Sequence, residues 1–349
     1  MVADFKAAAW KVLASAYCSS GVSLVRHRGR VAILTYHRVV SDDMVRTDHI
    51  QPGMYVRAQT FEAQVVYLQK HFVVLALDDL LERWRTDQMD PDKAYCVITF
   101  DDGWRDNYQY AFPVLKQYGL PATLFLATDF IGTDRWLWPD QVMFLLEESK
   151  KLMLSKQLSQ AVETAVMNIS GIDEKAKQQF YSRMDSERPI DSDAVVEWCK
   201  RLSVEVVGRF VDHLSTVVGV ELPKRRVLLN WDEVREMADN GISFGSHSCS
   251  HRILTQIPSS EVEQELGSSS QAMLLRGVKP IPVFCYPNGD SNQQVETLVG
   301  RNGYLAAVGC DKGLEGRKPD DVFNLKRFNM HEGSTATVPL FSLALSGLR

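Results

Sequence analysis

The chain has 349 residues, of which 45% are hydrophobic and 24% are charged, as in ordinary globular proteins. Its 39 Lys and Arg are outnumbered by 44 Asp and Glu, and without a basic stripe the sequence gives no reason to expect a nucleic-acid partner. No uncharged apolar run reaches the roughly 20 residues that span a bilayer. The six cysteines are scattered singly, which favours free thiols and a cytoplasmic location.

Residues 1–30 form a region of their own. Apolar residues recur at helical spacing from Phe5 to Tyr17, and three arginines follow between residues 26 and 30. This pattern predicts an amphipathic helix packed on the domain. The alternative is a helix that lies peripherally on an anionic surface such as the inner membrane. A cleaved signal peptide is not expected, because Lys11 interrupts the apolar run.

Residues 31–349 alternate between short apolar runs and helical patterns. The apolar runs are continuous rather than alternating, which indicates strands that are covered on both faces. Such a rhythm of strands and helices predicts a parallel sheet or barrel. The predicted strands lie within residues 31–36, 95–100, 121–128, 242–247, 282–287 and 304–309.

The segment from about residue 134 to 226 breaks this rhythm. It is rich in Lys, Glu, Gln and Ser, lacks strand-like runs, and shows helical spacing in its second half. It is far longer than a bare loop, which typically has about 4–6 residues. We therefore expect a helical insertion in the barrel.

The dipeptide Asp-Asp occurs four times, but only once in a position that suggests chemistry. Asp101 and Asp102 follow a buried strand and precede Gly103, whereas the other pairs have local explanations as a helix cap or exposed turns. Two carboxylates at the end of a barrel strand are costly for stability alone, and catalytic residues usually lie there. We expect one to be a base and the other a metal ligand.

His247 and His251 are four residues apart and follow another predicted strand. The spacing alone is a weak signal, and histidines with a purely structural role are the alternative. Two imidazoles and one carboxylate with an open position form a typical hydrolytic zinc site. Cys249 lies between the histidines, and we expect its side chain to point away from the metal.

Three motifs together carry a family resemblance. TFDDG (99–103), HSCSH (247–251) and CYPNG (285–289) occur in the order and spacing of the NodB-like polysaccharide deacetylases, carbohydrate esterase family 4. The chain resembles this family from about residue 35 to 327, most closely its bacterial members linked to exopolysaccharide and surface-glycan synthesis. The resemblance implies a distorted (β/α)7 barrel and a divalent-metal hydrolase that removes acetyl groups from N-acetylhexosamines.

The resemblance also implies a role for individual residues. Asp101 would be the general base that takes a proton from water. The ligands of one divalent ion, expected to be zinc, would be Asp102, His247 and His251. The substrate contacts would come from Tyr286, Pro287 and Asn288, with the backbone N–H of Asn288 donating to the oxyanion.

Two family features are missing from the sequence. Many members have an arginine where this chain has Cys285, and the late histidine that protonates the leaving amine is absent. Arg327 follows a strand-like run, and we predict that it pairs with Asp101 in place of the missing arginine. His37 follows the first strand and is the predicted acid, although a structural role at the barrel rim is the alternative. His331 ranks second.

The predicted activity is thus deacetylation of an N-acetylated glycan, either a polysaccharide or a lipid-linked glycan. One alternative is a catalytically inactive barrel that binds sugar. Another is the same fold hydrolysing a different C–N or ester bond, such as that of a formyl group. No feature of the sequence specifies an oligomeric state.

Overall fold

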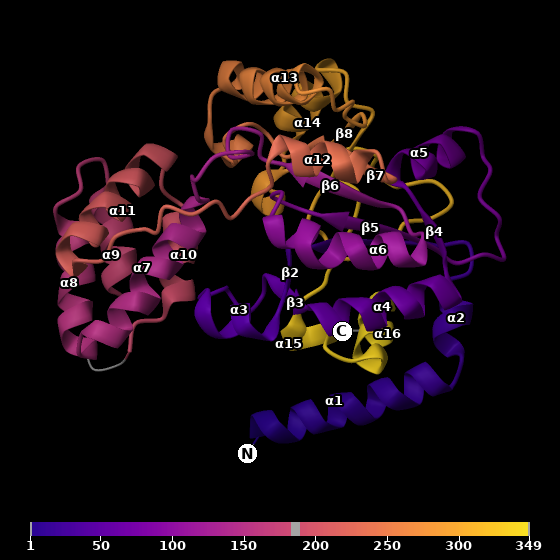
Figure 1. The fold of residues 1–349 in the computed structure, drawn as a ribbon, viewed down its shortest axis with the longest axis horizontal. Helices are drawn as coiled ribbons and strands as arrows, with labels where there is room; N and C mark the ends of the chain where they lie inside the picture. The colour runs from indigo at the N-terminus through magenta and orange to yellow at the C-terminus, as the bar shows by residue number, and fades with distance from the viewer. Residues whose placement is uncertain (1, 183–188, 348–349) are drawn as a thin grey trace. The chain divides into compact units, whose positions relative to one another are not determined.

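The computed structural model describes residues 2–182 and 189–347, shown as a ribbon in Figure 1. The side chains of residues 1–9, including the predicted apolar position Phe5, lie outside this description. Contacts divide the chain into two compact units. The first contains Met1–Asp42, Pro52–Thr133 and Val227–Arg349, and the second contains Asp43–Gln51 and Asp134–Arg226. The segment 43–51, which the sequence analysis assigns to the barrel, thus belongs with the insertion.

The first unit is built on a curled parallel sheet. Its strands follow the order β10-β1-β5-β6-β7-β8-β9, and β4 pairs with β5 beside this path. A parallel bridge between Val308 and Leu325 links the end of β9 to the segment that leads into β10. The strands are β1 (Val31–Tyr36), β4 (Val73–Leu75), β5 (Tyr95–Phe100), β6 (Ala122–Leu126), β7 (Ile242–Ser246), β8 (Val283–Cys285), β9 (Ala306–Val308) and β10 (Phe328–Asn329).

Helices cover this sheet, and every residue of β1, β5, β6, β8 and β9 is buried. The part formed by β7–β9 is covered by α12, α13 and α14, which lie together in Figure 1. A separate two-stranded parallel sheet joins β2 (Arg38–Val40) to β3 (Tyr55–Arg57). The helices of this unit are α1 (Val2–Ser19), α2 (Val22–Arg26), α4 (Ala58–His71), α5 (Leu77–Arg85), η1 (Asn107–Ala111), α6 (Phe112–Tyr118), α12 (Trp231–Ala238), η2 (Leu254–Gln256), α13 (Ser259–Leu275), η3 (Pro287–Gly289), α14 (Gln293–Arg301), α15 (Glu332–Thr335) and α16 (Val338–Leu345).

The predicted distorted (β/α) barrel is confirmed. All six strands expected from continuous apolar runs are present, and every residue of β1 and β5 is buried. The short strands β4 and β10 were not predicted, because three or two residues are too few for a recognisable apolar run. In the described residues, no helix is both long and apolar enough to cross a membrane.

The N-terminal helix α1 packs on α16. Ala14 is fully buried against Leu340 and Leu343, and Trp10 and Tyr17 flank it on the same face. This face of α1 thus packs on the C-terminal helix of the first unit.

The second unit is helical throughout its described part. Its helices α7, α8, α10 and α11 enclose an apolar core that includes Val162, Trp198 and Phe210. The Asp173 and Asp191 side chains cap α9 and α10 by accepting hydrogen bonds from backbone N–H groups. The helices are α3 (Asp42–Thr47, whose first residue belongs to the first unit), α7 (Trp138–Leu152), α8 (Ser155–Met167), α9 (Glu174–Tyr181), α10 (Ser192–Cys199) and α11 (Val204–Val218).

Candidate active site

The three sequence motifs form turns at the carboxyl ends of β5, β7 and β8. Parallel strands bring these ends to one face of the sheet. The backbone is strained at this face: of the six non-glycine residues with positive φ in the described chain, four lie in the three turns. They are Asp102, Ser248, His251 and Asn288. Strain of this kind costs about 1–3 kcal/mol per residue and collects at functional sites.

Glycine is required after the aspartate pair. Gly103 has a φ of 83°, and a Cβ atom there would lie 2.9 Å from the side chain of Leu126 and 3.0 Å from that of Ile131. A left-handed residue packed this closely leaves no room for a side chain. The tight turn holds Asp101 and Asp102 at the strand end and separates their directions.

Asp102, His247 and His251 converge on one point. Asp102 Oδ1 lies 3.4 Å from His247 Nε2 and 3.2 Å from His251 Nε2, and the two rings are 4.9 Å apart. All three ligand atoms lie within 4.8 Å of one another, as expected of groups that can share a metal ion. Burial by itself would raise the pKa of Asp102, but hydrogen bonds with both histidines hold it well below its usual range.

Neighbouring groups orient two of these three residues. Because a carbonyl can only accept, the 2.8 Å contact between His247 Nδ1 and the Cys285 carbonyl requires a proton on Nδ1 and leaves Nε2 for a ligand. The Trp104 indole N–H donates to Asp102 Oδ2 at 2.9 Å, which leaves Oδ1 facing the histidines. Both partners thus select the atoms that converge.

Glu265 on α13 anchors the loop that carries the two histidines. Its Oε2 accepts hydrogen bonds from the backbone N–H groups of Cys249 at 2.7 Å and Ser250 at 2.9 Å, and its Oε1 accepts from the Ser250 hydroxyl. The Cys249 thiol donates to the Glu265 carbonyl, and burial raises its pKa to about 12. Cys249 therefore faces α13 as a neutral thiol, in agreement with the expectation that it points away from the ligands.

Asp101 is paired with Arg327, the residue just before β10. Arg327 donates from Nη1 to Oδ1 and from Nη2 to Oδ2, each at 2.8 Å, and both side chains are buried. Burial alone would raise the pKa of Asp101, but the charge and hydrogen bonds of Arg327 outweigh it and lower the pKa to about 2. Asp101 is therefore ionised and its rotamer is fixed by a bidentate pair.

A second group of possible ligands, Asp101, His247 and Cys285, overlaps the first. Both Asp101 oxygens already accept from Arg327, and burial raises the pKa of the Cys285 thiol, so that it stays protonated. A metal ligand must be deprotonated, which the buried Cys285 thiol is not. The geometry therefore favours Asp102, His247 and His251 as the metal centre.

His37 lies beside Asp101. Its Nε2 is 4.0 Å from Asp101 Oδ2, and its Nδ1 is buried without a hydrogen-bond partner. Asn107, on the π-helical turn η1, donates to the His37 carbonyl at 2.9 Å and fixes the backbone there. Burial lowers the pKa of His37, although Asp102 and Asp101 oppose this. The imidazole is thus mainly neutral near neutral pH.

His331 lies at the same end of the neighbouring strand. Thr35 pairs with Asn329 in the register between β1 and β10, so His37 and His331 each follow two residues later. His331 is the N-cap of α15, and its carbonyl accepts hydrogen bonds from the backbone N–H groups of Ser334 and Thr335 in that helix.

The third motif is placed differently from the prediction in one respect. The Tyr286 ring is 1% exposed and packs 5.4 Å from Phe284 in an apolar cluster under α13 and α14. Side chains alternate along a strand, so Cys285 faces Arg327 while its two neighbours face the helices. The ring is therefore not at the metal centre. Pro287 is buried, and Asn288 is exposed with a φ of 60°.

Several supporting residues were not predicted. Asp106 binds Arg38 at 2.7 Å, and the Arg38 guanidinium lies 4.4 Å from the Trp104 ring. Three of these residues follow directly after the TFDDG motif: Trp104, Asp106 and Asn107. Their position next to the motif was a signal in the sequence that they could support the site. Glu265 offered none, because only folding brings α13 to the histidine loop.

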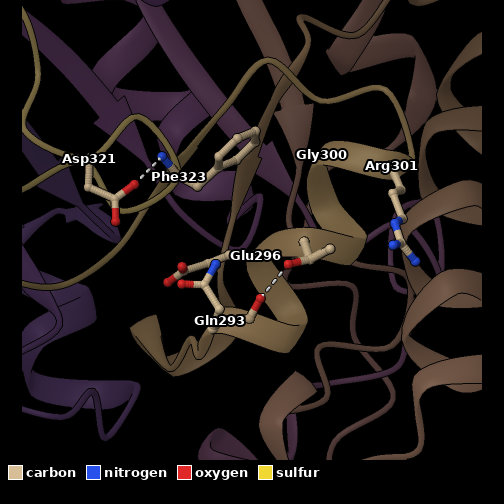
Figure 2. Close-up of a pocket in the computed structure, with 7 residues that line it drawn as sticks. Gln293, Glu296, Gly300, Arg301, Asp321 and Phe323 are labelled. Atoms are coloured by element: carbon tan, nitrogen blue, oxygen red, sulfur yellow. Dashed lines mark hydrogen bonds between the residues drawn. The ribbon is translucent and has the colours of Figure 1, made fainter.

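A pocket of about 540 Å³ on α14 is distinct from this site. Figure 2 shows Glu296 and Gln293 on the helix and Asp321 on the facing loop, where Asp321 accepts a hydrogen bond from the Phe323 N–H. The residues around this pocket are Gln293, Glu296, Thr297, Gly300, Arg301, Asp321 and Phe323. They include none of the residues that converge on the metal centre.

Comparisons with known proteins agree with this geometry. The chain is 33% identical over 113 residues to YxkH of Bacillus subtilis, in a match that covers 32% of this chain and 37% of YxkH. It is 25% identical over 228 residues to the poly-β-1,6-N-acetyl-D-glucosamine N-deacetylase of Staphylococcus epidermidis, covering 61% of this chain and 70% of that one. The chain thus spans little more than a third of the first relative and over two thirds of the second.

Two solved structures share the fold. The deacetylase PplD of Streptococcus pyogenes, in complex with acetate, matches with a TM-score of 0.54 and 17% identity over 88% of this chain and 95% of its own. IcaB from Ammonifex degensii matches with a TM-score of 0.55 and 14% identity over 91% of this chain and 97% of its own. The sequence profile of the family described as polysaccharide deacetylase matches residues 88–162 and 206–307, just over half of the chain. This chain is therefore a member of the polysaccharide deacetylase family.

Proposed function

We propose that this protein is a metal-dependent N-deacetylase that removes acetyl groups from N-acetylhexosamine units of a glycan. The observation that carries the proposal is the convergence of Asp102, His247 and His251 beside an ionised Asp101. The name of the Staphylococcus epidermidis relative supports a glycan of N-acetylglucosamine as the substrate class. The products are acetate and a glycan with a free amine.

The donor set fits one divalent ion. Two imidazoles and a carboxylate are typical ligands of zinc, and the hydrogen bonds from Trp104 and to the Cys285 carbonyl leave the correct atoms free. When bound, the ion would polarise the amide carbonyl and lower the pKa of a water molecule at the site. We propose zinc as the ion.

Asp101 acts as the general base in this proposal. Arg327 keeps the carboxylate of Asp101 ionised and fixes its orientation. The carboxylate therefore accepts the proton of the attacking water. The low pKa makes Asp101 a weak base, which suits a water already acidified at the site. The exposed backbone at Asn288 turns into the left-handed region and offers an N–H donor for the tetrahedral oxyanion.

His37 delivers the proton to the leaving amine. Because its pKa is lowered, the neutral imidazole must first receive a proton, and Asp101 lies 4.0 Å away. We propose that the proton taken up by Asp101 passes through His37 to the amine, so that both groups return to their starting states. His331 is the second candidate for this step.

The decisive experiment measures acetate and formate released from N-acetylated and N-formylated glucosamine oligomers. We expect acetate release with one equivalent of zinc and none after chelation, with His247→Ala as an inactive control. If the zinc-loaded protein binds the oligomer but releases neither acetate nor formate, the protein is a sugar-binding barrel without activity. Faster release of formate than of acetate would assign a different acyl group.

A further inference from the structure

We propose that α1 and α2 dock this protein on an anionic membrane surface, independently of the reaction at the strand ends. The first observation is that α1 is already fixed on the domain. Trp10, Ala14 and Tyr17 pack on α16, which runs beside α1 in Figure 1. His27 contacts the Leu345 carbonyl through Nε2 at 3.0 Å, so the end of α2 is fixed as well.

Apolar residues of the same helices stay exposed outside this packing, with Leu13 about 60° around α1 from Trp10, at the edge of the packed face. Val12 follows Trp10 by two residues and so lies about 200° around α1 from it, on the side away from α16. Val12 is 72% exposed and Leu13 is 51% exposed. On α2, Val22 and Val25 are 53% and 63% exposed. A helix that only packs on its own domain needs a single apolar stripe, so these two helices carry more apolar surface than packing uses.

Charge is distributed to match an anionic surface. Residues 1–30 contain five Lys and Arg and one Asp, a net charge of +4, whereas the whole chain has −5 and the remainder therefore −9. Four basic residues of this region are exposed: Lys11 next to Val12, Arg26 next to Val25, and Arg28 and Arg30 after the end of α2. Exposed apolar residues flanked by Lys and Arg are the pattern of helices that lie in the plane of an anionic bilayer.

A bilayer fits this surface better than a second copy of the chain. Two regions with a charge of +4 would repel each other when brought face to face. Four valine and leucine side chains are also too few for the roughly 1,200 Å² or more that a stable protein interface buries. A lipid surface needs no such area, because each basic residue adds attraction to the anionic headgroups.

The test is co-sedimentation of the full-length protein with vesicles. We expect binding to vesicles of phosphatidylcholine mixed with phosphatidylglycerol, little binding to phosphatidylcholine alone, and release by high salt. The double variant Val12→Asp, Leu13→Asp should lose binding. Arg28→Gln should weaken it by about fivefold, the effect of one basic residue near the surface.

The chain offers a matched control. Leu274 and Leu275 at the end of α13 are 56% and 77% exposed, and the double variant Leu274→Asp, Leu275→Asp adds the same charge far along the chain from α1. This control should bind vesicles as the wild type does, with both variants keeping the wild-type thermal unfolding midpoint. The proposal is overturned if both double variants bind equally. It is also overturned if the wild-type protein binds no vesicles but forms a dimer, and the Val12→Asp, Leu13→Asp variant does not form that dimer.

Discussion

The helical insertion and the strand ends of the barrel hold their charged residues in opposite ways. In the insertion, Lys177 pairs with Glu174 three residues earlier, and Lys200 pairs with Glu197, at positions open to solvent. At the strand ends, Asp101, Asp102 and Arg327 are each at most 3% exposed. Pairs within one helix follow from helix geometry alone. Buried charges cost several kcal/mol of desolvation per ion, so their presence needs an explanation beyond stability.

The backbone shows the same contrast. The insertion caps α9, α10 and α11 with side chains of Asp173, Asp191 and Ser203, as independent helices require. The motif turns instead place Asp102, His251 and other non-glycine residues at positive φ. Local rules thus account for the insertion, whereas the strand ends break them where the candidate chemistry lies.

Replacing His247 with alanine should abolish both metal retention and turnover. The change removes one of three converging ligand atoms, and the remaining two cannot hold the ion. Metal content by mass spectrometry and acetate release measure the effect. Cys249→Ser, in the same loop, should be nearly silent because the thiol faces α13. One equivalent of metal remaining in His247→Ala would disprove the assigned centre.

Asp101→Asn should keep the metal and lower kcat by about 10²–10⁴-fold, the usual contribution of a general base. The matched control is Asp321→Asn, in an Asp-Asp pair outside the site, whose Oδ1 accepts a hydrogen bond that asparagine can also accept. The control should keep wild-type turnover. If Asp101→Asn instead loses the metal, the roles of Asp101 and Asp102 are exchanged.

Arg327→Ala should lower kcat more than about tenfold and shift the pH profile. Without the guanidinium, burial raises the pKa of Asp101 from about 2, so the base becomes protonated, and activity is lost, at a higher pH. The stability that this pair contributes should be complete above the ordinary carboxyl pKa of 3.8 and disappear as the pH falls toward 2.

The alanine variant leaves a buried charge unpaired, which costs about 3–5 kcal/mol of stability. Arg327→Lys keeps the positive charge and loses the bidentate geometry. In a pH profile of kcat/KM, the activity of Arg327→Lys should be lost at the same low pH as that of the wild type. Its kcat should be lower than that of the wild type. An unchanged acid limb in a folded Arg327→Ala protein would contradict this role of Arg327.

His37→Ala should lower kcat more than about tenfold with metal content intact, because a proton donor to the amine is lost. His331→Ala should cost less. Steady-state rates of both variants on the same oligomer decide between them. Near-wild-type turnover in His37→Ala would eliminate it as the acid and leave its buried position a structural one.

The smallest effect is expected in the insertion. Lys177→Gln removes a pair whose Glu174 side chain is 82% exposed, and it should change the free energy of unfolding by less than about 0.5 kcal/mol. Urea denaturation measures this value. A loss of several kcal/mol would mean that the insertion also depends on its charges, and the contrast with the strand ends would fail.

Most of the fold and half of the site could be read from local sequence. Continuous apolar runs gave the positions of β1 and β5 because these strands are buried on both faces. Asp101, Asp102, His247 and His251 could be selected because each follows such a run. The pairing of Arg327 with Asp101, 226 positions away, was also expected, but from a strand-like run before Arg327 that is not a strand, because Arg327 precedes β10.

Other features depend on contacts that no local pattern encodes. Glu265 holds the histidine loop from a helix that begins after the motif, and nothing in its surroundings distinguishes it from other glutamates. The direction of the Tyr286 ring depends on which face of β8 meets α14, and the motif alone did not reveal it. The segment 43–51 joins the insertion through contacts such as His49 with Glu148 at 2.6 Å.

The pairing of Arg327 with Asp101 has a consequence for a chain emerging from the ribosome. The aspartate is synthesised 226 residues before its arginine, and the metal ligands are complete well before the segment that precedes β10. Until that segment takes its place beside β1, Asp101 lacks the bidentate partner that fixes its rotamer. A nascent or truncated chain ending before Arg327 can therefore bring Asp102, His247 and His251 together and still lack a fixed carboxylate at Asp101. We expect the complete cluster of side chains to form only when β10 is in place.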